Sequence, residues 1–170
     1  MTTRKELNAI LDNCDTCAGG DDASYYEHFT SCSQCIEYAE KAEQFETALV
    51  TLGEIAAEPY DVAKIRFLGE LKGIIDKPAK VGRQEMSNLL DCVAELPDPT
   101  RDKLCKVRTD LIMEMPKNHR DRLMGVLQEI MRGWTSERKL MEMRSVVKAT
   151  EDYQFLQKMM VRRKFNEMMN

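Results

Sequence analysis

Four cysteines in two closely spaced pairs are the residues of this sequence best suited to chemistry. Cys14 and Cys17 form one C-x-x-C pair, and Cys32 and Cys35 form a second pair after fourteen intervening residues. Each pair turns tightly enough to aim two thiolates at one ion, and two such pairs are typical of a closed tetrahedral zinc site. We therefore predict that these four cysteines hold one structural Zn²⁺ ion.

A histidine complicates this ligand count. His28 lies four residues before Cys32, so the site contains either all four cysteines or three cysteines with His28 as a substitute ligand. The paired spacing favours the all-cysteine site. The string from His28 to Cys35 reads H-x3-C-x2-C, and residues 28–40 resemble the zinc-binding anti-sigma-factor module, in which a histidine and two cysteines bind zinc on a helix pair. The resemblance implies zinc binding and a regulatory role through a protein partner.

Two alternatives use the same cysteines for redox chemistry. Four cysteines can also bind an iron–sulfur cluster, and C-x-x-C pairs can act as redox dithiols. The C-x2-C-x2-C-x3-C-P run of bacterial ferredoxins is absent from the sequence, which favours zinc. A site closed by four protein ligands leaves no open position for a substrate, and the sequence has no Gly-rich phosphate loop and no G-x-S-x-G motif. We therefore predict that the protein is not an enzyme.

Regularly spaced prolines organise the remainder of the chain. Pro59, Pro78, Pro97 and Pro116 are 19 residues apart, and apolar residues recur between them at helical intervals. Proline cannot continue a helix but is well suited to its start, so each proline is expected to end one helix and precede the next. The next unit of this repeat is expected to begin at Thr135.

The sequence thus predicts an all-α fold with a small four-cysteine head and 19-residue single-helix repeats. Short links make neighbouring helices antiparallel, and the repeats form either an α-solenoid or an antiparallel helical bundle. Residues 1–57 are expected to hold a short first helix, the metal module and a long helix from near Cys32 to Ile55. Residues 58–170 form the helical-repeat domain, in which Cys92 and Cys105 fit core positions.

Composition points to an ordinary water-soluble protein. The chain has 170 residues, of which 43% are hydrophobic, and this is enough for a real core. The start lacks the apolar region of a signal peptide, and no apolar run is long enough to span a bilayer. We expect a cytoplasmic protein without a transmembrane segment.

Charge is unevenly distributed along the chain. Residues 1–58 carry 3 basic and 12 acidic side chains, whereas residues 116–170 carry 12 basic and 7 acidic ones. We expect such polarity to steer a charged partner, or to let head and tail attract each other, either within one molecule or between two molecules of a homo-oligomer.

Methionines and a basic amphipathic helix mark the candidate binding surfaces. Ten of the twelve methionines lie at or beyond Met113, and the last helix, from about Glu151, combines apolar and basic residues. For methionines at repeat positions, such as Met124 and Met131, a core role is favoured. The main hypothesis is a non-enzymatic protein–protein interaction or regulatory module that binds through the Met-rich repeats or the basic C-terminal helix. The alternatives are a nucleic-acid-binding regulator that uses the zinc module and basic helices, and an iron–sulfur or thiol redox protein.

Overall fold

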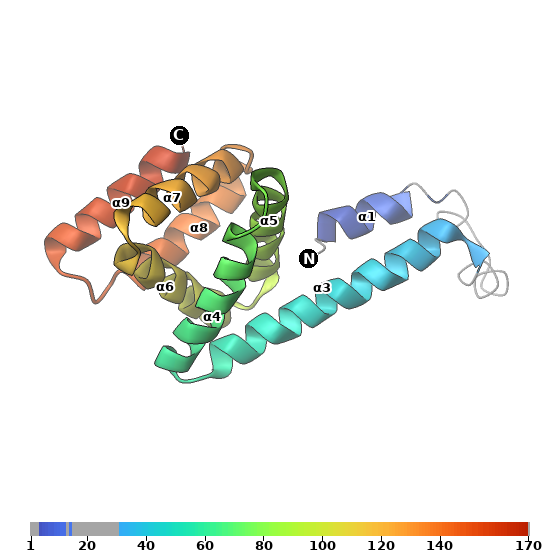
Figure 1. Cartoon of the computed structure of the whole chain (residues 1–170), viewed down its shortest axis with the longest axis horizontal. Helices are drawn as coiled ribbons and strands as arrows, with labels where there is room; N and C mark the ends of the chain where they lie inside the picture. Colours follow the sequence, from blue (N-terminus) through green and yellow to red (C-terminus); the bar gives the residue numbers. More distant parts are fainter. Residues whose placement is uncertain (1–3, 13, 15–30, 170) are drawn as a thin grey trace. The chain divides into compact units, whose positions relative to one another are not determined.

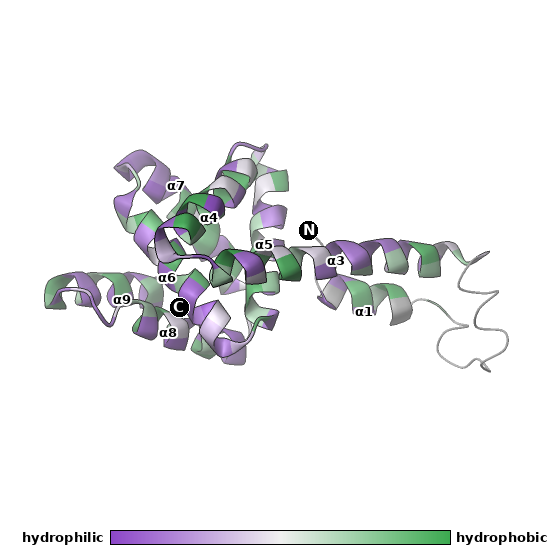
Figure 2. Cartoon of the chain, turned by 90° about the horizontal axis from the view of Figure 1, so that it is seen from below, coloured by the Kyte–Doolittle hydropathy of each residue, from purple (hydrophilic) through white to green (hydrophobic). Residues whose placement is uncertain are grey.

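All regular structure in the described part of the chain is α-helical. The computed structural model describes residues 4–12, 14 and 31–169, and within these residues no strand occurs (Figure 1). The predicted all-α fold class is confirmed. Hydrophobic and hydrophilic residues alternate along the helices, as expected for amphipathic helices packed around a core (Figure 2).

The chain divides into two compact units, residues 1–52 and 53–170, which we call the N-terminal and C-terminal units. The predicted domain boundary, between residues 57 and 58, lies at the end of the same long helix. The N-terminal unit contains α1 (Arg4–Asp12) and most of α3 (Ser33–Ala57). The predicted helix from near Cys32 to Ile55 is therefore present.

Among the described residues of the N-terminal unit, few side chains are buried. Leu7 of α1 and Phe45 of α3 are buried, and the guanidinium of Arg4 lies 5.6 Å from the centre of the Phe45 ring. A helix of nine residues is too short to be stable alone, so α1 depends on such contacts.

The C-terminal unit begins with the end of α3 and continues through six further helices. These are α4 (Tyr60–Ile75), α5 (Ala79–Glu95), α6 (Asp98–Glu114), α7 (Lys117–Arg132), α8 (Ser136–Ala149) and α9 (Phe155–Met169).

Each of the four regularly spaced prolines directly precedes a helix. Pro59, Pro78, Pro97 and Pro116 have extended backbone angles, and their carbonyl oxygens accept the first helical hydrogen bonds at 2.9–3.0 Å. Thr135 starts α8, where its side chain accepts a hydrogen bond from the Arg138 backbone N–H at 3.2 Å. The predicted helix starts are therefore correct, whereas the equivalence of the 19-residue units stays a prediction.

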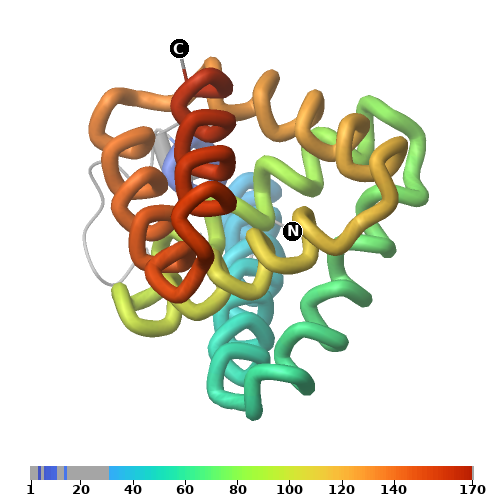
Figure 3. Tube along the Cα trace, turned by 90° about the vertical axis from the view of Figure 1, so that its left-hand side faces the viewer, coloured from blue at the N-terminus to red at the C-terminus, as the bar shows by residue number. Residues whose placement is uncertain are grey.

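Helices of the C-terminal unit pack mainly on their second neighbours. The helix α4 packs on α6, α5 on α7, α6 on α8, and α7 on α9, with further contacts between α4 and α5 and between α8 and α9. Figure 3 shows α9 in dark red beside the orange α8. The interior contains fully buried side chains from successive helices: Phe67, Leu71, Leu89, Leu104, Leu127 and Met131. Cys92 and Cys105 are also buried, as predicted.

The last helix begins later than the sequence suggested. We expected it from about Glu151, but Thr150 caps α8 and the next residues form turns, in which the Tyr153 N–H donates to the Thr150 carbonyl at 3.2 Å. The Tyr153 hydroxyl also donates to the Asp110 carboxylate of α6. This long-range contact holds the link out of the helix, so α9 starts at Phe155.

No helix within the described ranges has both the length and the apolar character that a membrane span requires.

Candidate metal centre and methionine-lined groove

The start of α3 positions two of the predicted metal ligands. The Cys32 carbonyl accepts the Ile36 N–H at 3.0 Å, so Cys32 stands at the head of the helix and Cys35 lies one turn later. Residues three apart lie on one face of a helix, which directs both side chains to the same side. Cys35 is fully buried and Cys32 is half-buried.

A third cysteine from outside this helix joins the pair. The Sγ atom of Cys14, which is buried, lies 3.7 Å from the Cys35 Sγ and 3.9 Å from the Cys32 Sγ. All three sulfur atoms lie within 4.8 Å of one another. The structure thus brings together three cysteines at a distance at which they could share one metal ion.

These distances match one tetrahedral ion. With zinc–sulfur bonds of about 2.3 Å, neighbouring sulfurs of a tetrahedron are about 3.8 Å apart. In a cubane iron–sulfur cluster each cysteine binds a different iron atom, which places the cysteine sulfurs farther apart than one tetrahedral edge. The two distances from the Cys14 sulfur therefore fit a single bound ion, and the identity of the metal stays a prediction.

Electrostatics also favour a cation at this position. Three thiolates so close together repel one another, and burial adds a desolvation cost to each charge. A metal cation bound to the three sulfurs would offset both penalties. The thiols of Cys14, Cys32 and Cys35 are not joined by disulfides.

Two predicted ligands, Cys17 and His28, lie outside the described residues. Three sulfurs that shared one tetrahedral ion would fill three of its four positions, so a structural zinc site here would take a fourth protein ligand. That the fourth ligand is Cys17, or alternatively His28, stays a prediction.

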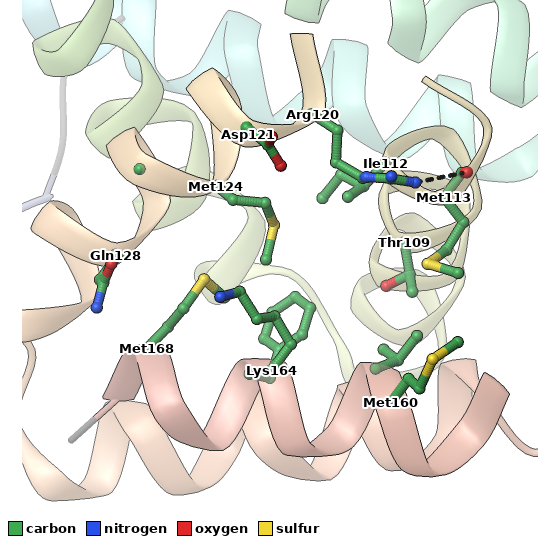
Figure 4. A pocket seen from close by; sticks show the side chains of 13 residues that line it. Thr109, Ile112, Met113, Arg120, Asp121, Met124, Gln128, Met160, Lys164 and Met168 are labelled. Carbon is green, nitrogen blue, oxygen red and sulfur yellow. Dashed lines mark hydrogen bonds between the residues drawn. The ribbon is translucent and has the colours of Figure 1, made fainter. Parts of the chain in front are cut away.

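A second feature, a cavity of about 550 Å³, lies between α6, α7 and α9 in the C-terminal unit (Figure 4). Its lining contains four methionines contributed by all three helices: Met113, Met124, Met160 and Met168. Met131 is buried in the core as predicted, whereas Met124 is only half-buried and lines this cavity. We call this cavity and its walls the groove.

Polar side chains stand around the apolar lining of the groove. Arg120 and Asp121 come from α7, and Lys164 comes from α9 (Figure 4). The Arg120 guanidinium donates to the Met113 carbonyl oxygen at 3.4 Å, which ties the start of α7 to the end of α6. The groove therefore combines adaptable thioether surface with cationic groups.

The wall formed by α9 continues as an exposed apolar surface beyond the cavity. Four large apolar side chains near its start are exposed, with Phe155 and Leu156 at 73% and 74% of their full accessible area. Met159 and Met160 are the other two, and Met160 also lines the groove. A last helix that only covered the core would keep such residues inside.

A buried ion pair supports the inner wall of the groove. Arg108 of α6 and Glu142 of α8 are 3% and 4% exposed and form a direct salt bridge. The Arg108 guanidinium also lies 5.9 Å from the centre of the Phe165 ring, which lines the groove. Sequence reasoning missed this pair because charged residues are mostly exposed, and nothing local distinguishes these two.

Comparisons of this chain with protein-family models, with curated proteins and with solved structures find no match.

Proposed function

We propose that this protein is a non-enzymatic zinc-binding helical protein that acts as a protein–protein interaction module. The observation that carries the interaction function is the exposed apolar surface of α9, which is continuous with the groove through Met160. Clustered exposed apolar residues are characteristic of binding sites, whereas an ordinary solvent-facing helix exposes only single, scattered apolar residues. The apolar lining supports a protein partner over a nucleic acid, whose phosphates need cationic contacts throughout.

Zinc is proposed as a structural ion in the N-terminal unit. The sulfur spacing of 3.7–3.9 Å between Cys14 and the other two cysteines supports a single tetrahedral ion. Because α1 is short and few described side chains of this unit are buried, an ion that links Cys14 to the start of α3 would stabilise the unit.

Metal content tests the zinc site. Elemental analysis of protein purified without oxygen is expected to give one equivalent of zinc and no absorption in the visible range. Cys35→Ser should lose the metal, whereas Cys92→Ala, which removes an equally buried thiol outside the group, should retain it. If the protein were coloured and contained iron, the structural zinc site would be rejected in favour of the iron–sulfur redox protein.

The interaction function is tested by selection from a random-peptide display library on the immobilised full-length chain. A counter-selection uses the variant Leu156→Ser with Met159→Ser, in which two exposed side chains become polar. Peptides that bind only the unaltered chain would support the proposal. If every enriched peptide bound both proteins equally, or none were enriched, the interaction function would have to be abandoned.

A thiol switch is a second candidate, favoured by one observation. Cys32 is half-buried, whereas Cys14 and Cys35 are buried, so an oxidant can reach one ligand of the group directly. Mild peroxide should then release zinc, and a thiol reductant with added zinc should restore it. Full retention of zinc under peroxide would contradict a switch and leave the structural role intact.

A further inference from the structure

The wall of the groove formed by α7 contains an opening at a glycine. Gly125 lines the groove, and a Cβ atom built on it would meet no heavy atom within 4 Å. The backbone of α7 is therefore open to a molecule that approaches through the groove. Glycine at such a position permits a close approach that any larger side chain would prevent.

The opposite wall is a row of side chains along α9. Leu156, Met160, Lys164 and Met168 are spaced by four residues and so lie above one another on one side of the helix. Twelve residues of helix extend over about 18 Å. The last three members line the groove, and Leu156 extends the row one turn beyond it. A surface of this length matches a helix of three to four turns. A small amphiphile would fill only the cavity and would not reach Leu156.

The helices that form these two walls are basic in a chain that is acidic as a whole, and their charged residues that line the groove are Arg120, Lys164 and Asp121. The net charge of the protein is −4. The helices α7 and α9 together nevertheless carry eight Lys and Arg residues against three Asp and Glu residues. The basic residues are Lys117, Arg120, Arg122, Arg132, Lys158, Arg162, Arg163 and Lys164. Such a charge pattern attracts an anionic partner and repels a cationic one.

We propose that this groove binds an amphipathic α-helix of another protein, with apolar anchors every three or four residues and acidic residues beside them. The anchors enter the thioether-lined cavity, and the acidic residues face the cations of α7 and α9. Binding of an amphipathic helix in an apolar groove is a common recognition mode, and flexible methionines adapt well to different anchors. This inference rests on the proposed interaction function and specifies its partner.

The test uses three fluorescein-labelled helical peptides of about 18 residues with the same leucine pattern. Their remaining positions carry glutamate in the first, lysine in the second and glutamine in the third. Fluorescence anisotropy with the full-length chain measures each affinity at low salt. The glutamate peptide is expected to bind at least about tenfold more tightly than the lysine peptide.

Two glycine variants locate the binding site. Gly125→Leu inserts a side chain into the groove at a position with open space, so the fold should persist while glutamate-peptide affinity falls at least about tenfold. Gly69→Leu is the matched control, because Gly69 of α4 is exposed, is equally free of neighbours and does not line the groove. This control should bind the peptide like the unaltered chain.

Several results would overturn the inference. The inference is wrong if the glutamate peptide does not bind, or if the lysine peptide binds as tightly as the glutamate peptide. It is also wrong if Gly125→Leu leaves the affinity for the glutamate peptide unchanged. Binding of dodecanoate without the glutamate peptide would identify a small amphiphile as the occupant and would also overturn it. In each case the display selection tests the proposed interaction function separately. Selected peptides whose binding depends on Leu156 and Met159 would support an interaction module with a different partner. If no such peptide were selected, both the interaction function and the inferred helical partner would be overturned.

Discussion

At the scale of single residues, Arg108 and Glu142 form the most deeply buried of the salt bridges seen in the described part of the chain. Burial alone lowers the pKa of Arg108, but the Glu142 carboxylate and the Cys105 sulfur together outweigh burial, so the pKa of Arg108 is raised and the guanidinium stays charged. One Arg108 Nη donates to Glu142 and lies 3.5 Å from the Cys105 Sγ. Burial also raises the pKa of the Cys105 thiol to about 12, which keeps it protonated.

Removal of one member of this pair should be severely destabilising. Glu142→Gln leaves the buried Arg108 cation without its counter-charge, and the free energy of unfolding is expected to fall by about 3–5 kcal/mol. Urea unfolding followed by circular dichroism measures the loss. Glu167→Gln is the control, because Glu167 and Arg163 form an exposed pair at 2.8 Å whose loss should cost at most about 1 kcal/mol. Equal effects of the two substitutions would show that the buried pair is unimportant.

A second cluster of polar residues joins three segments of the C-terminal unit. The hydroxyls of Tyr60 and Tyr153 both donate to the Asp110 carboxylate, and the Lys106 ammonium lies 3.4 Å from this carboxylate. The same ammonium lies 5.8 Å and 5.1 Å from the centres of the Tyr60 and Tyr153 rings. The cluster connects the start of α4, the middle of α6 and the link before α9.

These tyrosines should make the fold sensitive to alkali. Burial, followed by the hydrogen bond to Asp110, raises the pKa of Tyr60 and of Tyr153 well above the ordinary value of 10.0. Above this value the unfolded chain loses the phenolic protons and the folded chain keeps them, so stability falls as pH rises. Urea unfolding between about pH 8 and pH 11 should show this fall, with a shallower slope for Tyr60→Phe combined with Tyr153→Phe. An unchanged slope would exclude these tyrosines as its cause.

Residue-scale features differ in how far the sequence predicts them. Cys32 and Cys35 are only three residues apart, so the helix that starts there places both side chains on the same face. The contact of Tyr60 with Asp110 joins residues 50 positions apart, and that of Arg108 with Glu142 joins residues 34 apart. Such contacts depend on how the helices cross, and no local periodicity encodes this.

At the scale of elements, the helix starts were predictable wherever a local signal sets them. Proline excludes a preceding helical turn, so Pro59, Pro78, Pro97 and Pro116 mark helix starts regardless of packing. The start of α9 was predicted about four residues too early because a tertiary contact of Tyr153 determines it. The groove was also not predictable as a site, since its walls come from three helices.

The contact between α4 and α5 depends on one glycine. A Cβ atom at Gly82 would lie 2.7 Å from the backbone oxygen of Ile74, and backbone cannot move aside as a flexible side chain does. Gly82→Ala should therefore destabilise the protein by about 1–3 kcal/mol, although alanine is the better helix former. Thermal unfolding compares it with Gly69→Ala, which meets no atom within 4 Å and should stabilise by up to about 1 kcal/mol. Stabilisation by both substitutions would contradict the close approach of α5 to Ile74.

At the scale of the whole molecule, the chain combines a small unit with few buried side chains among its described residues and a larger unit with an extensive core. The C-terminal unit buries large apolar side chains from each of the helices α4 to α9 except α8, which contributes Val146 and Ala149. In the N-terminal unit the described buried apolar residues are fewer, and two of them are Cys14 and Cys35. Stability of the N-terminal unit should therefore depend on metal, and stability of the C-terminal unit should not.

Removal of the proposed zinc ion should consequently loosen one unit alone. Structural zinc sites contribute about 10–16 kcal/mol of binding free energy in zinc-finger peptides, far more than the short α1 can obtain from packing. With a zinc chelator, amide hydrogen exchange is expected to accelerate in residues 4–12 and at the start of α3, where Cys32 and Cys35 lie. Exchange in α6, whose Leu104 and Val107 are completely buried, should stay unchanged.

Variants separate loss of metal from other effects of the chelator. Cys35→Ser without chelator should reproduce the accelerated exchange in α1 and the first turns of α3, and Cys92→Ala should not, because Cys92 belongs to the core of the C-terminal unit. If chelation accelerated exchange in both units equally, the metal would stabilise the whole molecule and the two units would unfold together. If exchange stayed slow in α1 after complete loss of metal, packing such as that of Arg4 on Phe45 would suffice, and the ion would have a role other than structural support.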